Sequence, residues 1–286
     1  MEILGTFKNH DRYDGVFLGF NNLDWHLEFT QSDHKANHYP DKDDLIVLYL
    51  PSQIQIEIIK AKAIQEGLHW VKPKNPYWQK NGHQINDPDG YGIILALKDI
   101  PINADEMNNH LLTSKGINSW SHLLQYVRDL PYGRNSDRAN FDLVITENSG
   151  TCSSKHALVK KIADLNNIDV QLIIGIYKMD ASNTPGIGSY IADASLEYLP
   201  EAHCYLKSYG SVIDLTSNKS FFPKIENAVM EEIEIKPDDV ISYKVDYHKS
   251  FLKKWISKND IPYDFSQIWK IREACIASLA DQKYLK

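Results

Sequence analysis

The stretch SGTCSSKHALVKKIADLNNIDVQLIIGIY, residues 149–177, decides the fold of the second half of the chain. After Cys152, apolar side chains recur at helical spacing, at Ala157, Leu158, Ile162 and Leu165. This spacing predicts a helix of about four turns that opens at or near the cysteine, followed by a strand over VQLIIGIY. A helix N-terminus favours a thiolate, because its unpaired N–H groups carry a partial positive charge. Cys152 is therefore a candidate nucleophile.

A nucleophilic cysteine needs a base, and the base needs an orienting group. The segment EAHCYLKSYGSVIDLTS, residues 201–217, is typical of two strands joined by a tight turn. If Ser208 and Tyr209 form the turn, His203 and Asp214 lie directly opposite, with Cβ atoms about 4.5–5.5 Å apart. A turn one residue later keeps them on the same face, one diagonal apart, whereas a three-residue loop separates them. Two of these three registers allow a hydrogen bond.

A cysteine that opens a helix, a histidine on a strand and an aspartate on the next strand resemble the transglutaminase-like superfamily, over about residues 116–220. The resemblance implies an α+β cysteine-hydrolase fold for residues 117–286 and acyl transfer to water or to an amine. It assigns Cys152 as the nucleophile, His203 as the general base and acid, and Asp214 as the orienting group. The implied substrate is a small-molecule, peptide or protein acyl donor, and no cofactor is expected.

Four further residues are candidates for contact with the substrate, namely Gly150, Thr151, Tyr132 and Arg134. Gly150 would let a substrate carbonyl approach the backbone, where the N–H of Cys152 or of a neighbour could act as an oxyanion donor. Tyr132 and Arg134 lie in LPYGRNSDR and could recognise an acidic group at the border of the cleft. A solvated basic loop is the equal alternative for this segment.

The remaining cysteines and one more histidine are expected to be structural. A zinc site made of Cys152, His156, His203 and Cys204 is disfavoured, because adjacent strand residues point to opposite faces. Cys204 is thus expected in the core on the face opposite His203. His156 is expected to be a satisfied polar residue, and Cys275, in WKIREACIASLA, a packing residue of an amphipathic helix.

Residues 1–98 are typical of strands separated by turns. EILGTFK, GVFLGF and WHLEFTQ predict three short strands, and LIVLYLP predicts a strand buried on both faces. A helix is expected over Gln53–Glu66, with Ser52 as its N-cap and Gly67 as its stop. Strands around HWVKP, GHQIN and GIILALK complete the order strand, helix, strand, strand, strand, with a DPDG turn before the last.

This βαβββ order, with DGVFLGFNNLDWHLEFTQ and NPYWQKNGHQINDPDGYGIIL, resembles the vicinal oxygen chelate family of glyoxalases, ring-cleaving dioxygenases and antibiotic-resistance proteins. The first of the paired modules lacks the opening strand and helix of that family. Of the four metal-ligand positions, only Glu28 matches: one lies on the absent strand, residues 44–45 offer no histidine, and Ile94 replaces a carboxylate. One ligand does not hold a metal ion. The resemblance therefore implies a metal-free domain for binding or assembly, with a homodimer through this domain as one form of assembly.

Three alternatives stay open. Met1 could be an internal methionine, with a natural start upstream that encodes the absent strand and helix. The chain could be a metal-dependent lyase or dioxygenase centred on residues 1–98. Both domains could also bind small molecules or partners without catalysing a reaction.

Length and composition limit the number of domains and the classes of partner that are expected. The chain has 286 residues, of which 43% are hydrophobic and 24% are charged, which predicts a folded protein of about two domains. Its net charge of −7 argues against a nucleic-acid partner. No apolar run approaches the ~18–20 residues of a membrane span, no secretory leader is visible, and three cysteines favour a reducing, cytoplasmic setting.

Two segments outside the proposed sites complete the expected organisation. Residues 99–116, DIPINADEMNNHLLTSKG, are polar and predict a linker between domains 1–98 and 117–286. From about Asp239 onward, apolar residues at helical spacing predict two amphipathic helices that pack on the second domain.

Overall fold

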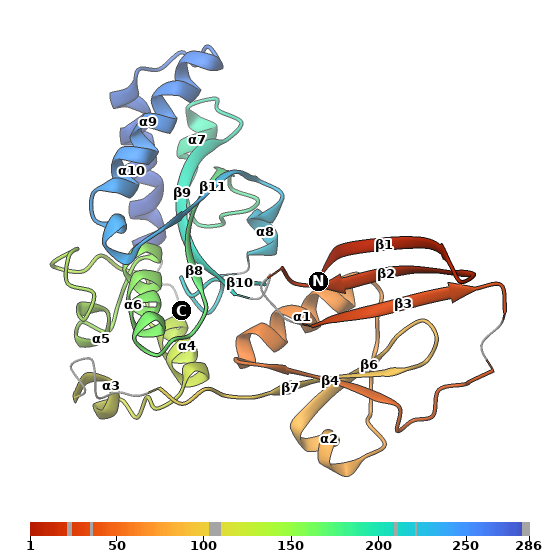
Figure 1. The fold of residues 1–286 in the computed structure, drawn as a ribbon. Coiled ribbons are helices and arrows are strands. Elements are labelled where there is room, and N and C mark those ends of the chain that lie inside the picture. The colour runs from red at the N-terminus through yellow and green to blue at the C-terminus, as the bar shows by residue number, and fades with distance from the viewer. Residues whose placement is uncertain (22–24, 35–36, 103–109, 209–210, 221, 282–286) are drawn as a thin grey trace. The chain divides into compact units, whose positions relative to one another are not determined.

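The computed structural model describes residues 1–21, 25–34, 37–102, 110–208, 211–220 and 222–281. The chain divides into two compact units, one formed mainly by residues 1–98 and the other mainly by residues 99–286 (Figure 1). No helix in these described ranges is long and apolar enough to span a bilayer.

The first unit begins with a three-stranded antiparallel sheet of order β1-β2-β3. Its strands are β1 (Glu2–His10), β2 (Tyr13–Gly19) and β3 (His26–Ser32), which confirms the three predicted strands. Large apolar side chains are exposed on it, with Ile3 at 69% and Phe29 at 50%.

The predicted order of strand, helix and three strands is confirmed in a second sheet of the same unit. The elements are β4 (Leu45–Leu50), α1 (Gln53–Gln65), β5 (Trp70–Val71), α2 (Pro76–Asn81), β6 (Gly82–Asn86) and β7 (Gly92–Leu97). The sheet order is β4-β7-β6-β5, and β4 runs parallel to β7. The short helix α2 was not predicted. Asn75 caps it by accepting a hydrogen bond from the Tyr77 N–H, and Pro76 occupies its first turn.

The helix cap, helix end and turn of this module lie where the sequence predicts them. Ser52 Oγ accepts the Gln55 N–H at 3.2 Å, as an N-cap does. Gly67 ends α1 with a φ of 79°, in the left-handed region that glycine adopts without strain. In the DPDG turn, the Gly90 N–H donates to the Asp87 carbonyl at 3.1 Å.

The second unit is built on a four-stranded sheet of order β10-β9-β8-β11. Its strands are β8 (Gln171–Met179), β9 (Leu199–Ser208), β10 (Ser211–Ile213) and β11 (Val229–Ile235). Strand β8 pairs antiparallel with both β9 and β11. Strand β11 was not predicted, although VMEEIEI carries the residue alternation of a strand with one exposed face.

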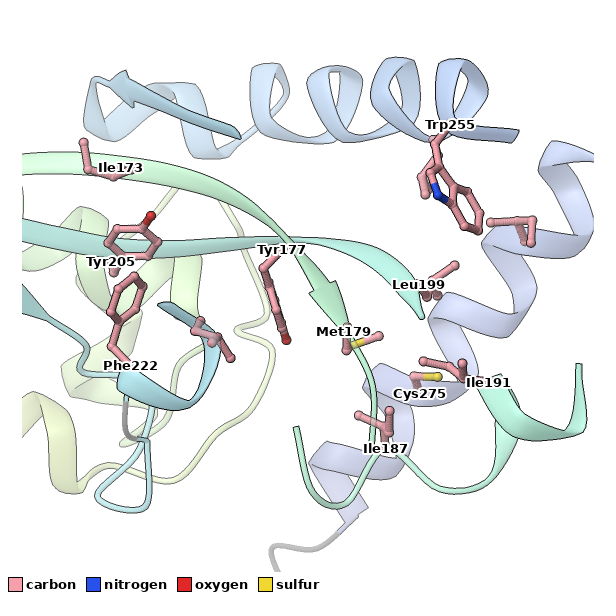
Figure 2. Packing of buried hydrophobic residues seen from close by; sticks show 13 residues of the cluster. Ile173, Tyr177, Met179, Ile187, Ile191, Leu199, Tyr205, Phe222, Trp255 and Cys275 are labelled. Atoms are coloured by element: carbon pink, nitrogen blue, oxygen red, sulfur yellow. The ribbon is translucent and has the colours of Figure 1, made fainter. Parts of the chain in front are cut away.

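Helices surround this sheet. They are α3 (His110–Ser114), α4 (Trp120–Asp129), α5 (Leu143–Thr146), α6 (Cys152–Leu165), α7 (Tyr190–Asp193), α8 (Pro223–Glu226), the 3₁₀ helix η2 (Pro237–Val240), α9 (Tyr243–Lys258) and α10 (Phe265–Asp281). One apolar cluster joins β8 and β9 to α9 and α10, with Leu199, Trp255 and Cys275 buried in it (Figure 2). The packing role of Cys275 and the two C-terminal helices are thereby confirmed.

The stretch 99–116 differs from the polar linker that its composition predicts. Residues 103–109 lie outside the described part, but the following residues form α3. Ile102 and Leu112 are buried at 7% and 3% exposure. The second half of the stretch therefore packs into the second unit, because its few apolar side chains are enough to anchor a one-turn helix.

Candidate active site

The first turn of α6 holds Cys152, as the apolar spacing predicted. Thr151 is the N-cap: its Oγ1 accepts the Ser154 N–H at 3.3 Å, and Ser154 Oγ accepts the Thr151 N–H at 3.0 Å. This reciprocal capping box defines where the helix begins. The backbone N–H groups of Cys152 and Ser153 have no intrahelical partner, since the first N–H groups of any helix have none. A partial positive charge thus lies beside the sulfur.

His203 and Asp214 meet, although the turn residues 209–210 lie outside the described part. His203 Nε2 lies 3.0 Å from Asp214 Oδ2, and both side chains are largely buried. Asp214 Oδ1 also accepts the Thr216 N–H at 3.0 Å. This contact requires the two side chains to share a face, as two of the three predicted registers allow.

The His203 imidazole also interacts with the Cys152 thiol. Burial disfavours the imidazolium, but the Asp214 carboxylate and the Cys152 sulfur together raise the pKa of His203 to about 10. A hydrogen bond from Cys204 lowers the pKa of Cys152 well below its ordinary value, against the effect of burial, and the charges of Lys244 and His203 lower it further. Both shifts favour the thiolate form of Cys152 and the imidazolium form of His203.

His156 makes two hydrogen bonds inside the core. Its Nδ1 donates to the Cys152 carbonyl at 2.6 Å, and its Nε2 accepts the Leu215 N–H at 2.8 Å. Burial lowers the pKa of His156 to about 4. The expectation of a satisfied polar residue is confirmed.

Cys204 is buried as predicted, but it lies beside the nucleophile. Its sulfur is 3.9 Å from Ser153 Oγ, which is also 4.0 Å from the Cys152 sulfur. Helix α6 packs against β9, and this packing brings its first turn beside Cys204. Cys204 is fully buried, as expected of a core residue, but its closeness to Cys152 was not predicted.

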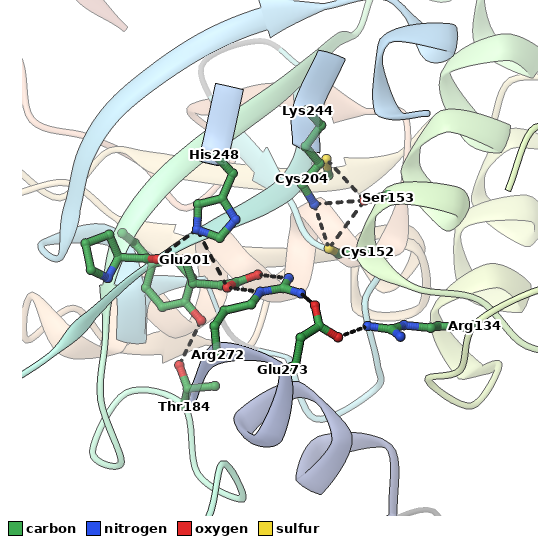
Figure 3. A network of polar contacts seen from close by, with 12 residues as sticks. Arg134, Cys152, Ser153, Thr184, Glu201, Cys204, Lys244, His248, Arg272 and Glu273 are labelled. Atoms are coloured by element: carbon green, nitrogen blue, oxygen red, sulfur yellow. Dashed lines mark hydrogen bonds and ion pairs between the residues drawn. The ribbon is translucent and has the colours of Figure 1, made fainter. Parts of the chain in front are cut away.

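Sequence reasoning missed the charged side chains that surround the cysteine (Figure 3). Lys244 Nζ lies 3.5 Å from Cys152 Sγ and donates to Ser153 Oγ at 2.8 Å. Glu201 on β9 accepts two hydrogen bonds from Arg272 on α10, at 2.8 Å and 2.5 Å. A signal was present, because Lys244 and His248 continue the buried helical stripe of Leu252 and Trp255.

Gly150 and Thr151 both have structural roles in the fold. The Gly150 N–H donates to the Pro131 carbonyl at 3.2 Å, and the Gly150 carbonyl accepts the Gly133 N–H at 3.1 Å, so neither group faces a substrate. A Cβ at Gly150 would lie 2.8 Å from Lys155 Cγ, which explains the glycine. Thr151 caps α6.

Tyr132 and Arg134 separate in the structure. Tyr132 forms a bridge with Gly150, and burial together with the negative charges of Cys152 and Glu201 raises its pKa above the usual value. Arg134 is 67% exposed and pairs with Glu273 Oε2 at 2.8 Å. Tyr132 therefore belongs to the surroundings of the cysteine, and Arg134 lies at their outer edge (Figure 3).

The described residues of the first unit do not fit a metal ion. Glu28 is exposed on β3, and Ile94 is fully buried in β7. In the described ranges, no group of three or more His, Cys, Asp or Glu side chains is arranged to hold an ion.

Comparison with known proteins concerns the first third of the chain. The model of the YycE-like N-terminal domain matches residues 1–30, and that of the YycE-like C-terminal domain matches residues 43–96. The YycE protein of Bacillus subtilis (strain 168), described as uncharacterized, is 39% identical over 93 residues, 32% of this chain and 67% of that protein. A crystal structure is known of a YycE protein from Bacillus subtilis, which is described as a protein of unknown function and a candidate glyoxalase/fosfomycin resistance protein. Its sequence is 38% identical to this chain. The match covers 33% of this chain and 70% of that one, with a TM-score of 0.31. Through residues 1–96, the chain belongs to the YycE-like family.

Proposed function

We propose that residues 99–286 catalyse cysteine-dependent acyl transfer, with hydrolysis as the case in which water is the acceptor. The observation that carries this proposal is the His203 imidazole, held 3.0 Å from Asp214 and acting on Cys152 at the first turn of α6. A nucleophile, a base and an orienting group in this relation are the requirements of covalent catalysis. The resemblance to the transglutaminase-like superfamily is part of the same proposal.

The chemistry follows from the protonation states. The Cys152 thiolate attacks the carbonyl carbon of an ester, thioester or amide; a sulfur–carbon bond forms and the carbonyl electron pair moves to oxygen. When the oxyanion collapses, the bond to the leaving group breaks, and His203 donates its proton to that group. His203, now neutral, removes a proton from water or an amine, which attacks the thioester and releases Cys152. Asp214 holds the imidazole in one orientation throughout.

The experiment is the release of p-nitrophenol from p-nitrophenyl acetate by the full chain. Cys152→Ala is expected to abolish the release, and His203→Gln to reduce it by a factor of about 10²–10⁴, because the base is lost. His122→Gln is the matched control: His122 lies exposed on α4 and should leave the rate unchanged.

Mass spectrometry should find one acetyl group on the Cys152 peptide during turnover. Equal rates for wild type and Cys152→Ala, or acetylation spread evenly over all three cysteines, would contradict the proposal.

A second candidate function rests on the YycE match and concerns residues 1–98. A protein described as a candidate glyoxalase/fosfomycin resistance protein supports a small-molecule site of that type here, and the comparisons favour this candidate over the cysteine chemistry. The described side chains of this unit are not arranged to hold a metal, so we infer binding of a small polar molecule or assembly of two copies rather than lyase chemistry.

Two measurements test the second candidate. Fosfomycin, and separately the hemithioacetal of methylglyoxal and glutathione, are titrated into the full chain by calorimetry, with and without added Mn²⁺ or Zn²⁺. Binding without metal supports the proposal. Turnover that requires the metal would replace it by the lyase function, and the absence of binding to either probe together with a monomeric mass in solution would count against it.

A further inference from the structure

Lys244, at the start of α9, is a buried ammonium that points at the sulfur of Cys152 (Figure 3). The residue is 7% exposed, and its Nζ lies 2.8 Å from Ser153 Oγ and 3.5 Å from Cys152 Sγ. A buried charge is strongly unfavourable unless an opposite charge or several hydrogen bonds compensate it. Lys244 therefore requires an anion close by.

The carboxylates nearby are committed to other cations. Glu201 is bound by both guanidinium contacts of Arg272, at 2.8 Å and 2.5 Å, and Asp214 is held by His203 at 3.0 Å. Within the described part of the chain, no carboxylate oxygen lies within 4.0 Å of Lys244 Nζ. The remaining anion is the Cys152 thiolate itself.

We propose that Lys244 is a catalytic residue, the counter-ion first of the Cys152 thiolate and then of the oxyanion that forms when the thiolate attacks. In that step the sulfur loses its negative charge to the new bond and the carbonyl oxygen gains it. An ammonium beside the sulfur stays within reach of both atoms, so its stabilisation is retained as the charge moves. The inference rests on the proposed acyl transfer and adds a residue to it.

The surroundings of Cys152 explain why the His203 imidazolium alone does not stabilise the negative charge of the thiolate and the oxyanion. Its imidazolium is shared between Asp214 and the sulfur, so the aspartate offsets much of its charge. Lys244 adds a charge that no carboxylate offsets at hydrogen-bond distance. The other titratable groups that face the pair include Lys155 and His156 on α6, Tyr132 on the loop after α4, Glu201 and Cys204 on β9, and Arg272 on α10.

The test is the pH dependence of Cys152 alkylation by iodoacetamide, followed by mass spectrometry of the Cys152 peptide in the full chain. Lys244→Met is expected to raise the midpoint of this profile by about one pH unit or more, the usual effect of removing an opposite charge within ~4–6 Å. Lys244→Arg should keep the wild-type midpoint within about half a unit, because it keeps the charge. Lys254→Met, at an exposed lysine of the same helix, is the matched control.

If Lys244→Met does not fold by circular dichroism, Lys244→Gln replaces it, since the amide keeps a hydrogen-bond donor without the charge. A midpoint unchanged by loss of the charge overturns the role of Lys244 while a low wild-type midpoint still supports the proposed function. An ordinary wild-type midpoint overturns the proposed function itself.

A second readout isolates the oxyanion. At a pH above both midpoints, where each protein is fully thiolate, acetylation of Cys152 by p-nitrophenyl acetate in Lys244→Met should remain at least about tenfold slower than in wild type. Equal rates at that pH would restrict Lys244 to the thiolate and refute its role at the oxyanion.

Discussion

His156 joins the nucleophile to the aspartate without touching a substrate. Its ring connects the Cys152 carbonyl to the N–H of Leu215, the residue after Asp214, and its Nε2 lies 3.8 Å from Asp214 Oδ1. The first turn of α6 and the end of β10 are thus held at one separation. His156 is a positioning residue, because it acts through the groups that it holds.

Replacing His156 by alanine should lower the free energy of unfolding by about 2–4 kcal/mol, because the buried Leu215 N–H loses its acceptor and a cavity forms. Urea unfolding followed by circular dichroism measures this. His122→Ala, at an exposed position of α4, should stay within about 0.5 kcal/mol of wild type. Similar losses for both variants would show that the two hydrogen bonds contribute little.

At the scale of secondary-structure elements, α6 shows most directly how local sequence positions a residue of the candidate active site. Its capping box defines the first turn, and that turn presents Cys152 with a favourable helix dipole. Helix α4 is capped in a related way, since Ser119 Oγ accepts the His122 N–H at 3.4 Å. The two caps offer a comparison in which only one element carries the cysteine.

Thr151→Ala and Ser119→Ala should each destabilise the protein by about 1 kcal/mol, the usual cost of losing an N-cap side chain. Only Thr151→Ala should also raise the pKa of Cys152, because only α6 positions that thiol. Urea unfolding and the alkylation profile of Cys152 are measured on the same samples. A shift of the profile in Ser119→Ala as large as that in Thr151→Ala would refute the local origin of the effect.

Over the whole molecule, buried charges are concentrated in the second unit. There, Glu201 and Asp214 are buried beside Arg272 and His203, and these partners lower the pKa values of both carboxyl groups despite burial. In the first unit, Asp41 also has a lowered pKa, through the backbone of Asp43 and the charge of Lys74, but it is fully exposed. The two units should therefore respond differently to acid.

Hydrogen exchange measured by mass spectrometry from pH 6.5 to pH 3 should show this difference. A carboxyl whose pKa is lowered in the folded state contributes stability above its unfolded pKa, and this stability is lost as the pH falls through the folded pKa. His156, with a pKa lowered to about 4, has the same sign and loses its contribution below about pH 6.5. Opening free energies of α6, β8 and β9 should thus fall more steeply than those of β4, β6 and β7. Equal slopes in both units would contradict the expectation.

The contribution of His203 to stability changes with pH in the opposite direction. Because its pKa is raised to about 10, its contribution to stability is complete below pH 6.5 and is lost as the pH rises toward 10. His203→Gln should therefore remove part of the decline in stability on the alkaline side. Because the imidazolium also lowers the pKa of Asp214, the decline on the acid side should become smaller as well.

What the sequence determined by itself was local. Apolar spacing, caps and turn residues predicted α6 with Cys152 at its start, the strand order of residues 43–98 and the two C-terminal helices, because these features depend on neighbours within a few residues. Strand register was narrowed to a few options, and two of them brought His203 and Asp214 together.

Which distant side chains surround the cysteine depends on tertiary packing. Lys244 lies 92 residues from Cys152 along the chain, and Cys204 lies near Cys152 because α6 packs against β9. Gly150 likewise owes its identity to Lys155 packing against it. Such contacts depend on how helices and sheet pack in space, and the spacing of residues along the chain carries no direct record of that packing.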